Sequence, residues 1–182
     1  MSDVLGIICA RKDSQRLPDK NLQRINGLTL VENAAKILHE AGVQPVVIAT
    51  DFELDFDPAV YSARHVLRSA NISSDKVPLQ ETVKWVYHSL GQTADTIVFL
   101  MPNCPMVTPD AVRKAAAMVS EGSFNVVRSY GPDGHENGLI AVRTKYLLDH
   151  FIDVYCGCVI CEGREIHDRQ DFLDVKQQME RG

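Results

Sequence analysis

The chain of 182 residues is 45% hydrophobic and 24% charged, which predicts one globular domain over residues 1–182 with a sizeable core. Its net charge of −5 argues against a general nucleic-acid-binding protein, because such proteins are usually basic. No stretch approaches the roughly 20 apolar residues of a membrane span, and the N-terminus lacks the basic and apolar regions of a signal peptide. We therefore expect a cytoplasmic protein.

The first predicted element is a short buried strand over residues 5–8, which ends in a polar loop. The loop holds four cations and two neutral hydrogen-bonding groups: Arg11, Lys12, Arg16, Lys20, Ser14 and Asn21. Cations and loop amides at the carboxyl end of an α/β strand form a natural site for polyphosphate. A solvated basic loop is the alternative that charge alone leaves open. We expect residues 9–22 to form a phosphate-binding loop.

Helices and strands then alternate along the chain. Apolar residues recur at helical spacing over residues 28–42, where Gly42 supplies a stop. Thr108 is the expected N-cap of a helix that continues to residue 119, with Pro109 at its first position. We expect the other strands at residues 45–51, 65–67, 95–101, 124–130, 139–143 and 153–161, and the other helices at 83–90, 145–150 and from about 171.

This alternation predicts the α/β class: a single three-layer domain with a mostly parallel, Rossmann-like sheet of about six or seven strands. The strand over residues 139–143 is expected to lie antiparallel beside the strand before it. Ligands of such sheets bind beyond the carboxyl ends of the strands. Those ends carry the cationic loop, Thr50, Asp51 and the turn at residues 102–105, so the loop should lie at the mouth of the fold.

Five cysteines, an odd number in a chain without an export signal, predict reduced thiols. Cys156, Cys158 and Cys161 have a spacing that invites a metal, with His167 as the nearest fourth ligand. The surrounding sequence alternates like a strand, however, and places Cys156, Cys158 and Ile160 on one face. We therefore expect small buried strand residues here in preference to a metal site.

Six motifs, in order along nearly the whole chain, resemble those of one family. Residues 10–22, ARKDSQRLPDKNL, follow its pattern A-R-x-G-S-x-R-(I/L)-P-x-K-N-(I/L). The other five motifs lie at residues 49–51, 68–75, 101–106, 136–138 and 165–172. On these motifs the chain resembles the cytidylyltransferases that activate acidic sugars, among which the acylneuraminate (CMP-sialic acid) enzymes are most similar. The resemblance implies the nucleotide-diphospho-sugar transferase type of fold.

The resemblance also implies a reaction. CMP would move from CTP to the anomeric hydroxyl of a 2-keto sugar acid, a sialic acid or another nonulosonic acid, with release of pyrophosphate. Catalysis would rest on positioning and charge neutralisation by Arg11, Arg16 and Lys20. The nucleotide-binding residues implied are Ala10, Arg11, Ser14, Arg16, Lys20, Asn21, Arg68 and Asp75. The sugar-binding residues implied are Asn103, Glu136 and Asn137.

A Mg²⁺ ion, held in the family by the two aspartates of a closing D-x-D element, is the implied cofactor. Here the aligned pair is Glu165 and His167, and Asp168 stands one residue further on. Hard Mg²⁺ prefers oxygen ligands, so Mn²⁺ is the alternative cation if the imidazole is a ligand.

Departures from the family pattern leave alternatives open. Asp13 replaces a glycine, Met101 replaces a glutamine, and the segment before Glu136 lacks the family's long dimerisation insert. CTP and a small acidic sugar are the expected partners, without nucleic acid or membrane, and a homo-oligomer need not be the family's usual dimer. Arg68 and Asp75 could instead form a surface pair that closes a loop. The chain could also bind nucleotide without efficient catalysis, or transfer another nucleotide or use another sugar on the same fold.

Overall fold

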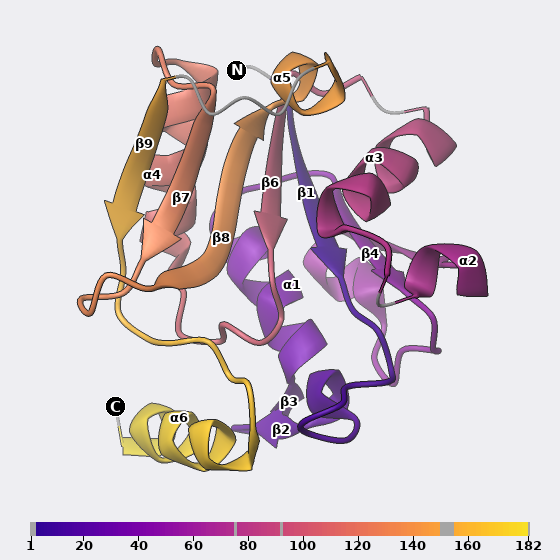
Figure 1. Ribbon diagram of the computed structural model, residues 1–182, viewed down its shortest axis with the longest axis vertical. Coiled ribbons are helices and arrows are strands. Elements are labelled where there is room, and N and C mark those ends of the chain that lie inside the picture. Colours follow the sequence, from indigo (N-terminus) through magenta and orange to yellow (C-terminus); the bar gives the residue numbers. More distant parts are fainter. Residues whose placement is uncertain (1–2, 75, 92, 150–154, 182) are drawn as a thin grey trace.

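The computed structural model describes residues 3–74, 76–91, 93–149 and 155–181. Its central feature is a seven-stranded sheet in the order β5-β4-β1-β6-β8-β7-β9 (Figure 1). The strands are β1 (Val4–Cys9), β4 (Val46–Thr50), β5 (Ala63–Leu67), β6 (Thr96–Leu100), β7 (Val126–Tyr130), β8 (Glu136–Arg143) and β9 (Cys156–Ile160). Strand β8 runs antiparallel to β6 and β7, whereas the other neighbours pair in parallel, as predicted.

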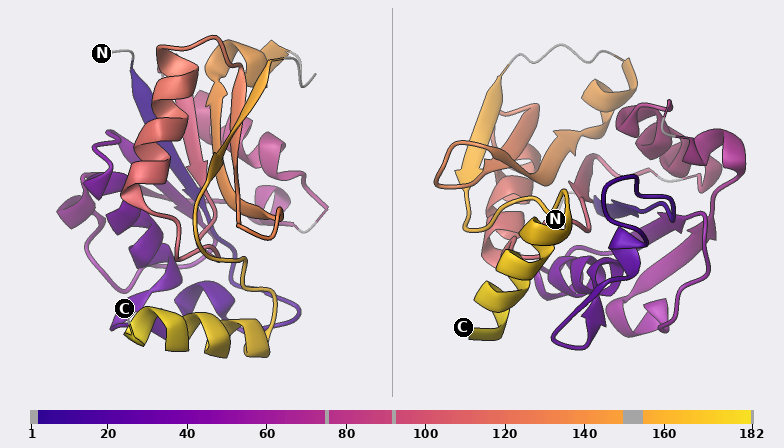
Figure 2. Two further views of the ribbon diagram at one scale, coloured as in Figure 1. Left: turned by 90° about the vertical axis from the view of Figure 1, so that its left-hand side faces the viewer. Right: turned by 60° about the horizontal axis from the view of Figure 1, so that its bottom comes forward.

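Helices pack on both faces of this sheet (Figures 1 and 2). The helices are α1 (Leu30–Glu40), α2 (Ala70–Ser73), α3 (Leu79–Ser89), α4 (Pro109–Ser120), α5 (Thr144–Asp149) and α6 (Arg169–Arg181), with short 3₁₀ turns η1 (Lys20–Leu22) and η2 (Pro58–Tyr61). Strand side chains such as Ile8 and Leu100 face α1 and α4, and their neighbours Ile7 and Phe99 face α3 and α5. Alternation along each strand thus builds two cores, and the predicted three-layer α/β fold is confirmed.

Helix α6 lies away from the sheet, beside the hairpin of β2 (Arg24–Ile25) and β3 (Leu28–Thr29) (Figure 1). A third apolar cluster joins it to the opening loop: Leu17, Ile25, Leu30, Ile166, Phe172 and Val175. Burial of these side chains carries the segment just before α6 back to the loop that follows β1. Two parts of the chain about 150 residues apart thereby meet.

The helix signals are confirmed, but several boundaries need correction, among them the start of α3, which lies at Leu79 and not at residue 83. The Thr108 hydroxyl accepts a hydrogen bond from the Ala111 amide at 3.2 Å, as an N-cap does. Helix α1 is followed by Gly42, whose φ of +77° suits the left-handed region. Strand β8 begins at Glu136 and not at residue 139, because beyond a register shift Tyr130 pairs with Glu136. Helix α6 begins two residues earlier than predicted, at Arg169.

The cysteine strand differs from its prediction. Cys156 and Cys158 are exposed, because β9 is an edge strand whose face carrying them is left uncovered by the described helices. Cys161 is buried, as expected. Nowhere in the described ranges do three or more His, Cys, Asp or Glu side chains gather as metal ligands. In the same ranges, no helix has the length and apolarity needed to cross a membrane.

Candidate functional site

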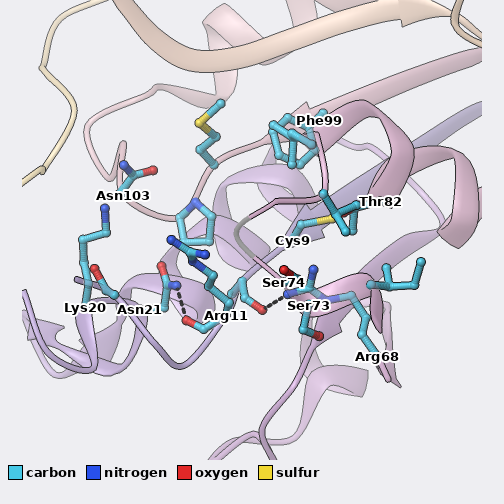
Figure 3. Close-up of a pocket in the computed structure, with 17 residues that line it drawn as sticks. Cys9, Arg11, Lys20, Asn21, Arg68, Ser73, Ser74, Thr82, Phe99 and Asn103 are labelled. Atoms are coloured by element: carbon cyan, nitrogen blue, oxygen red, sulfur yellow. Dashed lines mark hydrogen bonds between the residues drawn. The ribbon is translucent and has the colours of Figure 1, made fainter. Parts of the chain in front are cut away.

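A pocket of about 270 Å³ opens at the carboxyl ends of β1 and β6, with η1 on one side and the segment between α2 and α3 on the other (Figure 3). The polar groups on its walls are Arg11, Ser14, Lys20, Asn21, Arg68, Ser73, Ser74 and Asn103. Its less polar part includes Ala10, Cys9, Leu79, Thr82, Phe99 and Met101. The pocket therefore combines a cationic rim with a flatter, more apolar interior.

Three cations line this pocket, two from the opening loop and one from the segment after β5. Figure 3 shows Arg11 between Lys20 on one side and Arg68 on the other. The loop is braced by Asn21, whose amide donates to the Arg11 carbonyl at 2.8 Å. The Arg68 guanidinium donates to the Ala10 carbonyl, while its Nε is buried without a hydrogen-bond partner among the described residues. Guanidinium and ammonium groups so placed suit the oxygens of a polyphosphate.

Lys20 links the opening loop to the segment before α6. Its Nζ donates to the Ile166 carbonyl at 3.0 Å. Burial lowers the pKa of the Lys20 ammonium, and Arg16 and Arg11 lower it further, whereas Glu165 acts in the opposite direction. A bound anion would favour the charged form of this lysine.

Glu165 and His167 form a polar network at the rim. The Asn103 amide donates to Glu165 Oε1 at 2.6 Å, and His167 Nε2 lies 3.5 Å from Glu165 Oε2. Arg16 Nη2 lies 3.2 Å from His167 Nδ1. Because a guanidinium only donates, the neutral imidazole accepts at Nδ1 and carries its proton on Nε2, facing Glu165. The imidazole is thus engaged on both sides.

The predicted metal ligands fit a divalent cation only in part. Asp168 Oδ1 accepts hydrogen bonds from the Gln170 and Asp171 amides at 2.8 and 3.0 Å. The hydrogen bond from the Asp171 amide is the main reason why the pKa of Asp168 is lowered. Asp168 therefore caps helix α6. Glu165, the other predicted carboxylate, does not line the pocket, but it accepts a hydrogen bond from Asn103, which does, and it could hold a hard cation together with phosphate oxygens.

Seven of the predicted site residues line the same pocket: Ala10, Arg11, Ser14, Lys20, Asn21, Arg68 and Asn103. Arg16 is exposed and bonds His167 outside that lining. Asp13 is also exposed and does not line the pocket. Asp75 lies outside the described residues.

The predicted sugar-binding residues Glu136 and Asn137 lie elsewhere. Asn137 is 1% exposed, and its amide donates to the Cys161 carbonyl at 3.2 Å, so it braces the core. Glu136 pairs with Arg128, with 3.4 Å between Oε1 and Nη1. Both precede Gly138, whose positive φ of +78° and close approach to Cys104 leave no room for a Cβ atom. The E-N-G motif is therefore the start of strand β8 and not an open loop.

Sequence patterns did not identify the interior of the pocket. Phe99 and Cys9 belong to predicted strands, where apolar side chains look alike whether they face a helix or a ligand. Thr82 is 3% exposed on α3 and lines the pocket. The one sequence signal for Thr82 was its position directly before the apolar stripe of a predicted helix.

Comparison with known proteins shows the family of the chain. A family model described as cytidylyltransferase matches residues 5–144. A CMP-N,N′-diacetyllegionaminic acid synthase of Legionella pneumophila is 28% identical over 62% of this chain and 51% of its own length. A 3-deoxy-manno-octulosonate cytidylyltransferase of Cellvibrio japonicus is 27% identical over 75% of this chain and 55% of its own length. The chain thus spans about half the length of these curated relatives.

Solved structures share the fold. A CMP:2-keto-3-deoxy-manno-octonic acid synthetase complexed with CTP superposes with a TM-score of 0.77 at 17% identity, covering 99% of both chains. Rv0371c of Mycobacterium tuberculosis H37Rv, in complex with manganese, gives a TM-score of 0.63 at 13% identity, covering 97% of this chain and 99% of the other.

Proposed function

Because the chain belongs to the cytidylyltransferase family, we propose that it transfers CMP from CTP to the anomeric hydroxyl of a 2-keto sugar acid. One observation carries this proposal: Arg11, Lys20 and Arg68 converge on a single pocket at the carboxyl ends of the strands. The names of the relatives, which act on sugar acids, support the choice of acceptor.

In the proposed reaction, the acceptor's hydroxyl oxygen attacks the α-phosphorus of CTP, and the bond from this phosphorus to the bridging oxygen breaks. Pyrophosphate leaves, and the hydroxyl proton passes to solvent. Arg11, Lys20 and Arg68 would hold the triphosphate in line for this displacement and offset the charge on the leaving group. Thr82 and Phe99, in the interior, would face the base or ribose.

We further propose that Glu165 binds a divalent cation at the rim of the pocket. Phosphate oxygens and water would supply the remaining ligands. A bound Mg²⁺ or Mn²⁺ would supply positive charge that offsets the charge of the phosphates. Arg16 would position Glu165 through His167, and Asn103 would position it directly. A cytoplasmic location and the oligomeric state stay predictions.

The test is pyrophosphate release from CTP, with Mg²⁺ or Mn²⁺ and a panel of 2-keto sugar acids, beside calorimetric titration of CTP, UTP and ATP. We expect release that depends on the acid and on CTP. Arg11→Gln should weaken CTP binding at least tenfold, since a charge-assisted bond to phosphate is lost. Lys12→Gln is the matched control, because Lys12 is exposed, does not line the pocket and uses its backbone amide to bond Asp51.

A second candidate function is nucleotide binding without transfer. The engagement of His167 and the capping role of Asp168 favour it, because only one predicted metal carboxylate faces the rim. Tight CTP binding with no pyrophosphate release from any acid would select this candidate. Equal affinity for UTP or ATP would instead select a nucleotidyltransferase for another nucleotide.

A further inference from the structure

Strand β9 forms one edge of the sheet, and β7 is the one described strand that pairs with it (Figure 1). In an extended strand, the amide and carbonyl of one residue point to the same side, and those of the next residue point to the other side. The Cys161 amide donates to the Tyr130 carbonyl of β7 at 3.0 Å, so every second residue back from Cys161 faces β7. The backbone groups of Cys158 and Ile160 therefore point away from the sheet, where a further strand could bond them.

This edge lacks the features that usually prevent pairing with another chain, which are charged side chains, prolines and bulges. Residues 155–161, YCGCVIC, contain neither a charged residue nor a proline. The five residues of β9 pair with β7 in an unbroken register, without a bulge. The strand at the opposite edge, β5, differs because it carries Arg64 and His65. Of the two edges, β9 is thus the one suited to pairing.

The charges around β9 favour a second copy of the chain as its partner. Two neutral strands can pair with each other without bringing like charges together. The charged residue in register with Cys158 is Arg128 on β7, which Glu136 neutralises with 3.4 Å between Oε1 and Nη1. Two paired copies would hold their Arg128 residues three strand spacings apart, about 14 Å. The strand also offers no charged group by which a different partner could be selected.

The side chains of β9 also suit this pairing. Val159 is 1% exposed, and α4 packs behind the strand. Ile160, 64% exposed, stands on the face of β9 that no described helix covers. Beside Cys156 of a second copy, Ile160 would lose part of its contact with water, which is favourable. Pairing along the edge leaves the cysteine side chains on the uncovered face, where reagents reach them.

We propose that two copies of the chain associate through β9, antiparallel about a two-fold axis at Cys158, so that two seven-stranded sheets join edge to edge. Cys158 then lies opposite its counterpart, and two residues that exchange both backbone hydrogen bonds have Cα atoms about 5.5 Å apart. This interface uses no part of the dimerisation insert that the chain lacks. It lies three strands from β6 and the nucleotide pocket, so it does not depend on the proposed function.

Analytical ultracentrifugation of the full chain over a wide range of concentrations tests the association. We expect a reversible equilibrium between monomer and dimer. Ile160→Lys, which adds a charge to the edge, should raise the dissociation constant of the dimer at least tenfold and leave the circular dichroism spectrum unchanged. Leu67→Lys is the matched control, because Leu67 is the last residue of β5 and is 53% exposed at the opposite edge. It should change neither quantity. A monomer at every concentration, or association that Leu67→Lys weakens as much, would overturn the proposal.

Oxidation tests the register of the two strands. A disulfide joins Cα atoms about 4.4 to 6.8 Å apart, which the Cys158 pair satisfies, whereas the two Cys156 residues would stand four residues apart, about 14 Å. Dioxygen with copper phenanthroline, which takes one electron and one proton from each thiol, should trap a covalent dimer of the wild type. Both cysteines are exposed, so their serine variants are matched. The cross-link should persist in Cys156→Ser and disappear in Cys158→Ser. Its persistence in Cys158→Ser, or its loss in Cys156→Ser, would refute the proposed pairing.

Discussion

At the scale of single residues, Lys20 is the cation whose environment differs most from water. Burial holds its pKa below the ordinary lysine value of 10.5 while the pocket contains no anion. A triphosphate beside it would raise that pKa again. The charge that binds the nucleotide is therefore partly restored by the nucleotide itself.

This coupling predicts that CTP binding takes up a proton at alkaline pH. Between about pH 8 and 10 the phosphates are already ionised, since their last pKa is about 6. CTP affinity should then fall as pH rises, beginning below 10.5. Calorimetry in two buffers of different ionisation enthalpy measures the proton. Lys20→Arg stays charged throughout, so a fall in affinity as steep as in the wild type would contradict the prediction.

Residue roles within the opening loop could not be separated by sequence alone. Arg11, Arg16 and Lys20 share the same motif, yet Arg16 reaches His167 and does not line the pocket. On charge alone, the carboxylate of Asp13 would be expected to repel the phosphates. Asp13 is exposed, however, and does not line the pocket. Loop side chains a few residues apart can point in opposite directions, and only the backbone conformation decides which do.

At the scale of elements, the long periodic segments were predicted well and the short ones were not. Helices α1, α3 and α4 carry clear apolar stripes. Sequence predicted the N-cap of α4 and the glycine after α1, but not the start of α3 at Leu79. The β2–β3 hairpin was missed although Asn26 and Gly27, with φ of +51° and +83°, form a typical two-residue turn. Each of its strands has two residues, too few for a pattern of alternation to appear.

The prediction at this scale concerns the stability of helix α6. Asp168 caps it, and the lowered pKa of that carboxyl means that its ionised form stabilises the folded state. Asp168→Ala should lower the melting temperature at pH 7. The difference from wild type should shrink as pH falls below the ordinary value of 3.8, where the carboxylate becomes protonated.

The same variant separates capping from metal binding. Manganese binding in the presence of CTP, followed by electron paramagnetic resonance, should persist in Asp168→Ala and weaken in Glu165→Gln. Asp168→Asn, which keeps a cap acceptor but no charge, should melt between the wild type and the alanine variant. Loss of manganese from Asp168→Ala with its melting temperature unchanged would reverse the two roles.

At the scale of the whole molecule, the fold class and the mostly parallel sheet follow from the βαβ pattern, but which parts of the sheet the helices cover does not. Helices α1 and α4 cover one face, and α3 and α5 pack over its other face near β1 and β6. Near β9 no helix among the described residues covers this second face, and Ile160 is 64% exposed. Alternation along a strand shows that its two faces carry different side chains. Only the packed helices decide which of these faces is covered.

The open face predicts a pattern of thiol reactivity. Cys156 and Cys158 are exposed on β9. Burial raises the pKa of the Cys9 thiol to about 12 and also raises the pKa values of Cys104 and Cys161. The thiolate is the reactive form. An aromatic disulfide reagent at pH 8 should therefore label two thiols quickly, and the other three only after unfolding in urea.

Single replacements assign the fast thiols, because Cys156→Ser and Cys158→Ser should each remove one fast equivalent. Labelling should not depend on protein concentration if this face stays open in solution. If the fast phase is lost at high concentration, a second copy covers β9, and the arrangement of the sheet edge derived from one chain is incomplete. Fast labelling of Cys9, which lines the nucleotide pocket, would instead contradict the raised pKa of its thiol, and CTP should slow any reaction that does occur there.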